Sequence, residues 1–223
     1  MYDREIMKQR RKIAKERLDK QLALNKHITI DAEPDDFKRI QDFCNRLAWE
    51  KYYDSLYTLD GSQMYERNIS GKIAEVAVGK WLGTDIVDLS FGDAKDYSVP
   101  DCSPAGYEIG VKCCRTTSAV PYVPANPKYP EIICAFDEKN SKVYILGLAT
   151  VEVMKKYADE KLNGDSIKPT YKKGFDRFDL LQPLSLELID KYRINKSLDD
   201  IMKSATNKVQ TTNSHSPEKP KTH

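Results

Sequence analysis

Residues 100–114 read PDCSPAGYEIGVKCC and combine a turn with the start of a strand. From residue 107 onward the side chains alternate with a period of two. The two faces then carry Ile109, Val111 and Cys113 on one side, and Glu108, Gly110, Lys112 and Cys114 on the other. Ser103, Pro104 and Gly106 favour a reversal of the chain, so residues 95–99 and 107–114 are expected to pair as a hairpin.

This hairpin brings carboxylates together. With the turn centred near residues 104 and 105, Asp101 faces Glu108, and Asp96 lies diagonally near Lys112. Side chains paired in this way lie about 5 Å apart at Cβ. Two carboxylates at that separation repel each other unless a positive charge lies between them, and a divalent cation beside a lysine is such an arrangement. Cross-strand ion pairs on a solvated face are the alternative interpretation.

A third carboxylate is expected on the helix that precedes this segment. Residues 69–82 form an apolar run interrupted by Glu75, with Gly71 and Gly79 four residues to either side. These three positions share one helix face, which leaves a groove where another backbone can approach. Because glycine inside a helix costs about 1 kcal/mol relative to alanine, the pair suggests a geometric requirement. A surface glutamate beside glycines tolerated for packing explains the same pattern.

Composition excludes several other kinds of site. The 223 residues include three histidines and five cysteines without CxxC spacing, so a structural zinc site, a Ser-His-Asp triad and a Cys-His pair lack parts. The nucleotide-binding patterns GxGxxG and GxxxxGK[ST] are absent. No apolar stretch approaches the roughly 18–20 residues that cross a bilayer, so we expect a soluble, cytoplasmic protein without a membrane partner.

The order of expected elements predicts a mixed sheet with helices packed on it, which is an α/β fold. Helices are expected at 3–24, from 34 to about 59, at 63–82 with Gly83 ending the last, at 150–158 and at 183–192. Short strands are expected at 86–89, 95–99, 107–114, 131–137 and 143–149, the last two joined as a hairpin. Residues 25–33 and 163–174 are expected as a linker and a polar loop.

The ordered set of these features resembles the PD-(D/E)XK nuclease superfamily, over roughly residues 65–155. It comprises Glu75 in a glycine-flanked helix, Pro100-Asp101, a strand with Val111-Lys112, a hairpin and a short helix. The resemblance implies a restriction-endonuclease-like mixed β-sheet flanked by helices. It also implies Mg²⁺, for which Mn²⁺ would substitute, bound by Asp101, Glu108 and Glu75, with Lys112 as the catalytic lysine.

One position departs from the motif. The residue two before the lysine should be acidic, but here it is Gly110. Three explanations stay open: Glu108 reaches the site through a bulge that glycine permits, Glu75 or Asp96 completes the site, or the nuclease is inactive.

The function implied is a Mg²⁺-dependent endonuclease of restriction or phage type that hydrolyses DNA, and the resemblance suggests a homodimer. The alternative is a degenerate nuclease fold that binds nucleic acid or a protein. Candidate DNA contacts are Lys72, Lys80, Arg115 and Thr117. The expected organisation is a basic helical arm and linker at 1–33, a restriction-endonuclease-like domain at 34–203 and a disordered tail at 204–223. The nine basic side chains among residues 1–26 indicate either a solvated helix or an arm that lies on phosphates.

Overall fold

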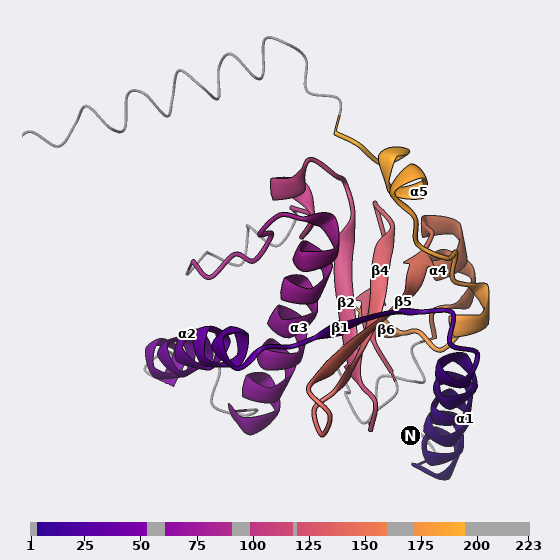
Figure 1. Cartoon of the computed structure of the whole chain (residues 1–223). Helices are drawn as coiled ribbons and strands as arrows, with labels where there is room; N and C mark the ends of the chain where they lie inside the picture. Colours follow the sequence, from indigo (N-terminus) through magenta and orange to yellow (C-terminus); the bar gives the residue numbers. More distant parts are fainter. Residues whose placement is uncertain (1–3, 53–60, 91–98, 118–119, 160–171, 195–223) are drawn as a thin grey trace, which may run out of the picture. The chain divides into compact units, whose positions relative to one another are not determined.

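A mixed four-stranded sheet with helices on both faces forms the centre of the molecule (Figure 1). The computed structural model describes residues 4–52, 61–90, 99–117, 120–159 and 172–194. Strand order in the sheet is β1 (Ile28–Asp31), β5 (Lys142–Ala149), β4 (Glu131–Asp137) and β2 (Gly110–Arg115). β2 runs parallel to β4, whereas β5 is antiparallel to both β4 and β1. The expected α/β class with a mixed sheet is therefore confirmed.

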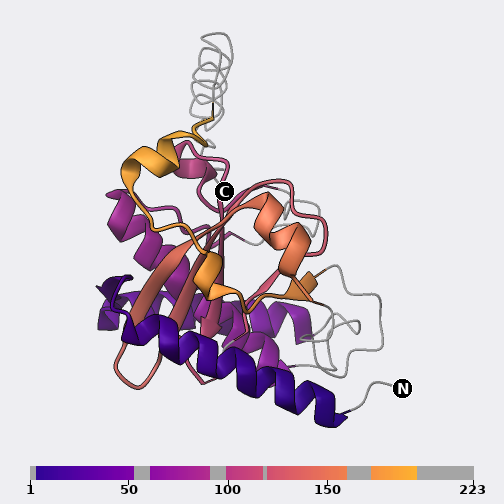
Figure 2. The ribbon, with the colours of Figure 1, turned by 90° about the vertical axis from the view of Figure 1, so that its right-hand side faces the viewer.

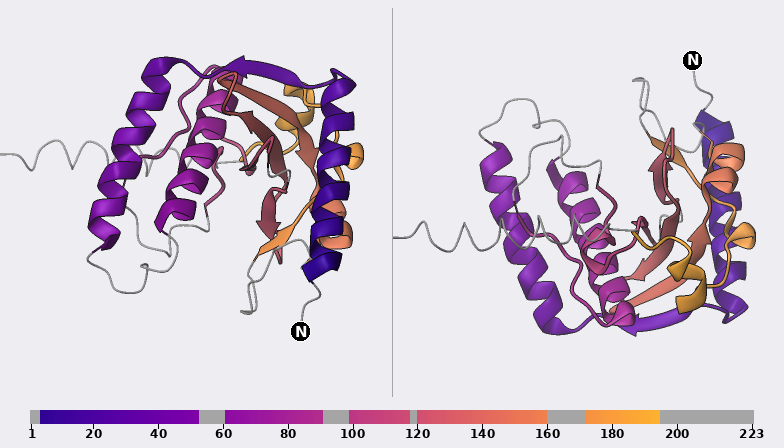
Figure 3. Two further views of the ribbon diagram at one scale, coloured as in Figure 1. Left: turned by 90° about the horizontal axis from the view of Figure 1, so that it is seen from below. Right: turned by 90° about the horizontal axis from the view of Figure 1, so that it is seen from above.

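Helices cover the two faces of the sheet separately, as Figure 3 shows. α2 (Pro34–Tyr52) and α3 (Gly61–Leu82) lie on one side, and α1 (Arg4–Ala23) and α4 (Val151–Tyr157) lie on the other. β4 is buried at its first six positions, because a central strand meets a core on each face. The core on the α3 side includes Ile73, Ile132 and Phe136, and the core on the α1 side includes Leu18, Ile133 and Phe178.

The β4–β5 hairpin, the C-terminal end of α3 and the start of α4 agree with the sequence. The hairpin register pairs Asp137 with Lys142. Thr150 caps α4 by accepting a hydrogen bond from the N–H of Val153 at 3.3 Å. Gly83 ends α3 with φ of 71°, and the N–H of Thr84 donates to the carbonyl of Gly79 at 3.0 Å, which is a Schellman-type ending.

Several expectations about local structure are wrong. Residues 86–89 are irregular rather than a strand, and the strand expected from 107 begins at Gly110. The expected linker contains β1. The proline-rich residues 120–130 contribute β3 (Tyr122–Pro124), and the expected polar loop contributes β6 (Lys172–Gly174), which pairs with β3. The last helix is shorter than expected, α5 (Leu186–Asp190). Most of the strand expected at 95–99 and the helical residues expected at 53–59 lie outside the described residues.

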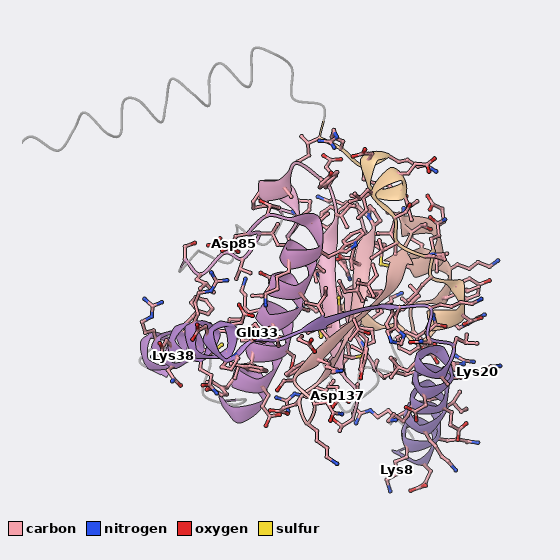
Figure 4. The ribbon with its side chains drawn as sticks, in the orientation of Figure 1. Lys8, Lys20, Glu33, Lys38, Asp85 and Asp137 are labelled. Atoms are coloured by element: carbon pink, nitrogen blue, oxygen red, sulfur yellow. The ribbon has the colours of Figure 1, made fainter. Side chains whose placement is uncertain are left out.

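The N-terminal segment expected as a separate arm belongs to the main unit. Residues 1–193 form one compact unit, and β1 is a strand of its sheet. Ala14 and Leu18 on α1 are fully buried, while Lys8 and Lys20, labelled in Figure 4, are exposed. The alternation of buried and exposed positions shows that α1 is a packed amphipathic helix. Figure 2 shows its length along this side of the sheet. The expected tail at 204–223 lies outside the described residues.

Candidate active site

Asp101 is held against the start of β2 by a tight turn. The turn contains a 3₁₀ helix, Ser103–Ala105, and the N–H of Cys102 donates to the carbonyl of Ile109 at 2.9 Å. The carboxylate Oδ2 of Asp101 accepts a hydrogen bond from the N–H of Val111 at 2.6 Å. Asp101 therefore lies beside the first residues of β2 rather than opposite Glu108, as the sequence suggested.

Lys112 joins two carboxylates from different parts of the chain. Its Nζ lies 3.3 Å from Oδ2 of Asp101 and 3.2 Å from Oε2 of Glu131, and it donates to the carbonyl of Val111 at 2.9 Å. Burial disfavours the charged ammonium, but the charges of Glu131 and Asp101 outweigh that effect and raise the pKa of Lys112 above its usual value. Lys112 is therefore positively charged at neutral pH.

Glu131 occupies the space that a side chain at residue 110 would fill. Parallel pairing of β2 and β4 places Gly110 directly beside Glu131. A Cβ added to Gly110 would lie 2.1 Å from Oε2 of Glu131 and 2.7 Å from its Cδ. The carboxylate of Glu131 on the neighbouring strand therefore fills the space beside Gly110, and glycine at 110 leaves room for it.

The carboxylate of Glu131 is buried with Lys112 as its partner. Its side chain is 0% exposed, and the Lys112 ammonium lies 3.2 Å from Oε2, whereas Oε1 has no hydrogen-bond donor among the residues that the structure describes. Burial raises its pKa to about 7, and the neighbouring charge of Lys112 opposes that rise. A buried carboxylate of this kind calls for a further cation or hydrogen-bond donor.

Glu75 approaches the same group from α3. Its Oε2 accepts a hydrogen bond from Nζ of Lys72 at 2.8 Å. Burial raises the pKa of Glu75 to about 7; Lys72 opposes that rise, and Asp101 adds to it. The expected close backbone approach exists at Gly79, where an added Cβ would lie 2.6 Å from the carbonyl oxygen of Thr84, but Gly71 faces open space.

The remaining sequence-predicted residues lie elsewhere or are exposed. Glu108 is exposed just before β2, and none of the ion pairs recorded for Lys112 within the described ranges involves it. Lys80 pairs with Asp36 at 2.7 Å, on the side of α2. Thr117 is exposed in the turn that follows β2.

Arg115 points into a different set of contacts. Its Nη1 lies 3.1 Å from Glu66 and 3.4 Å from Glu138, and its Nε donates to the hydroxyl of Ser70 at 3.2 Å. Of the four candidate DNA contacts, only Lys72 lies beside a residue of the candidate site, because its Nζ donates to Glu75. Asp96 lies outside the described residues.

The donor set suits Mg²⁺ in kind. Within the described parts of the chain, no group of three or more His, Cys, Asp or Glu side chains is arranged to hold a metal ion. Asp101 and Glu131 contribute carboxylate oxygens, the ligands that Mg²⁺ prefers, on either side of the Lys112 ammonium. The Lys112 ammonium already lies 3.2 Å from Oε2 of Glu131, so Oε1 is the oxygen of this carboxylate left for a further cation.

Comparisons with family models, with curated proteins and with solved structures find no match to this chain. Within the described residues, no helix is both long enough and apolar enough to cross a membrane.

Proposed function

We propose that this protein is a Mg²⁺-dependent nuclease that hydrolyses DNA phosphodiester bonds on a restriction-endonuclease-like fold. The observation that carries the proposal is the carboxylate of Glu131 in the space beside Gly110, 3.2 Å from Lys112. The expected constellation would then consist of Asp101, Glu131 and Lys112. Its second acid, Glu131, comes from the adjacent strand β4 instead of from residue 110.

In this proposal Asp101 and Glu131 hold the metal ion, and Glu75 adds a ligand or orients water. A bound Mg²⁺ supplies charge stabilisation at the phosphate and lowers the pKa of water. Mn²⁺, which accepts the same oxygen ligands, is expected to substitute.

The protein's own groups would carry the remaining steps. The ammonium of Lys112 places positive charge where the phosphate gains negative charge during attack by water. Glu75, as a carboxylate beside the metal, would orient that water and accept its proton. Water adds to phosphorus as its proton passes to Glu75, the P–O ester bond breaks, and the leaving ester oxygen takes a proton from solvent water.

Cleavage of DNA tests the proposal. Supercoiled plasmid and a labelled single strand are incubated with the purified protein in Mg²⁺, in Mn²⁺ and in EDTA, alongside Lys112→Ala and the control Lys80→Ala, whose lysine pairs with Asp36. We expect metal-dependent cutting that Lys112→Ala abolishes and Lys80→Ala retains. Equal cutting by Lys112→Ala would contradict the mechanism. Salt-dependent DNA binding without cutting in either metal would favour the degenerate binding protein.

A further inference from the structure

A pocket lies on the α1 side of the sheet, and neither Asp101 nor Glu131 lines it. Its volume is about 540 Å³, within the range of roughly 300–1,000 Å³ typical of ligand sites. α1 contributes Gln9, Arg10, Ile13 and Arg17, and the segment after β6 contributes Asp176 and Arg177. With Asp159, the pocket therefore combines three guanidinium groups and two carboxylates, so its formal charge is +1.

These arginines are positioned by ion pairs. Arg10 pairs with Asp159, and Nη1 of Arg17 lies 2.5 Å from Oδ2 of Asp176. Arg10 and Arg17 nevertheless stay 39% and 42% exposed. Because a guanidinium has five N–H donors, contact with one carboxylate leaves it able to bind a further anion.

Arg177 gives the pocket a flat wall. Its guanidinium carbon lies 4.8 Å from the centre of the Tyr157 ring, and its Nη2 pairs with Asp179 at 2.8 Å. An arginine stacked on an aromatic ring is a surface on which a nucleobase can also stack. Guanidinium donors beside such a wall suit a nucleotide, which carries both a phosphate and a planar base.

We propose that this pocket binds a phosphate group of a nucleic-acid strand. The contacts would come from the guanidinium groups of Arg10, Arg17 and Arg177, because the exposed Lys8, Arg11 and Lys12 lie on other faces of α1. The inference rests on the proposed function in one respect: the strand bound here is taken to be the strand that is cut.

The pocket and the candidate active site lie at the two ends of one short segment. Lys172 begins β6, and its positive charge acts on the carboxylate of Glu131, while Asp176 and Arg177 line the pocket. Six residues span at most about 20 Å. A strand of duplex DNA covers that length in about six nucleotides.

Binding of a fluorescein-labelled 20-nucleotide single strand in EDTA tests the pocket without requiring cleavage. Gln9→Glu adds a negative charge to the pocket and Gln9→Lys a positive one, and both leave every arginine ion pair in place. Gln41→Glu and Gln41→Lys make the same charge changes at an exposed position on α2 and serve as matched controls. Thermal unfolding of each variant verifies the fold.

We expect Gln9→Glu to weaken binding about five- to tenfold relative to Gln41→Glu, and Gln9→Lys to tighten it relative to Gln41→Lys. The dependence of log affinity on log salt should become shallower by about one in Gln9→Glu. Equal affinities within each pair would overturn the pocket inference, even if the protein cuts DNA. A difference in binding without cleavage would instead support the pocket and contradict the nuclease.

Discussion

At the scale of single residues, ionisation of the buried Glu131 lowers the free energy of unfolding of the protein. Its carboxyl is fully buried, and burial raises its pKa to about 7 from an ordinary value near 4.5. A carboxyl whose pKa is raised by folding stabilises the folded state below the unfolded pKa, and that stability is lost as the pH rises through the folded pKa. The metal-free protein therefore loses stability progressively as the pH rises from about 4.5 to about 7, and the loss persists above pH 7.

Glu131→Gln removes this titration. In EDTA, we expect the free energy of unfolding of the wild-type protein to fall by about 2 kcal/mol relative to Glu131→Gln between pH 5 and pH 8. Urea unfolding at several pH values measures the difference. Parallel pH profiles for the two proteins would show that Glu131 is ionised throughout that range.

Lys112 stabilises the cluster as well as being the candidate catalytic lysine. Lys112→Ala leaves the buried Glu131 without its ammonium partner, and removal of one member of a buried ion pair costs several kcal/mol. We expect Lys112→Ala to lose about 2–4 kcal/mol of unfolding free energy at pH 8 in EDTA, and less at pH 5, where Glu131 is protonated. Lys80→Ala is the control. If Lys112→Ala lost no more unfolding free energy at pH 8 than Lys80→Ala, the Lys112–Glu131 ion pair would contribute nothing to stability.

At the scale of elements, the register of β2 and β4 decides where the acid is. Gly110→Glu alone should disrupt the cluster, because the new Cβ would lie 2.1 Å from Oε2 of Glu131. Glu131→Ala alone should abolish cleavage. The double variant moves the acid back to β2 and is expected to restore metal-dependent cleavage to within about tenfold of wild type. The cleavage rates of the three variants are compared with that of the wild type. A double variant as inactive as Glu131→Ala would show that an acid at residue 110 cannot replace Glu131.

α1 contributes to stability through its buried stripe. We expect Leu18→Ala to reduce the free energy of unfolding by about 2–5 kcal/mol, because Leu18 is 0% exposed in the core with Phe175 and Phe178. Leu24→Ala is the matched control, since Leu24 is 51% exposed beyond the end of the helix. Urea unfolding compares the two. Equal, small effects would mean that α1 is the separate arm suggested by its charge.

The elements predicted from sequence are those with strong local signals. The β4–β5 hairpin carries long apolar runs on either side of a polar turn, and Gly83 marks the end of α3. β1, β3 and β6 have three or four residues each, and their pairing partners are far away in sequence. Such strands exist because of tertiary pairing, which a local pattern does not contain.

At the scale of the whole molecule, the candidate site depends on a parallel pairing between strands separated by a loop. Sequence predicts Asp101, Lys112 and Glu75, because each lies in a recognisable local pattern. It misses Glu131, since the acid at the start of an apolar strand gives no hint of its neighbour. The sequence does show glycine where the motif has an acid, at Gly110. The β2–β4 register is needed to show that the side chain of Glu131 fills the space beside it.

The central claim, that Glu131 is the metal-binding acid, is tested most directly by metal binding of two isosteric variants. Mn²⁺ affinity is measured by calorimetry for the wild-type protein, for Glu131→Gln and for Glu108→Gln. The second variant removes the exposed carboxylate two residues before the start of β2. We predict that Glu131→Gln weakens Mn²⁺ binding at least tenfold and that Glu108→Gln binds as the wild type does. Loss of binding in Glu108→Gln with normal binding in Glu131→Gln would contradict the account.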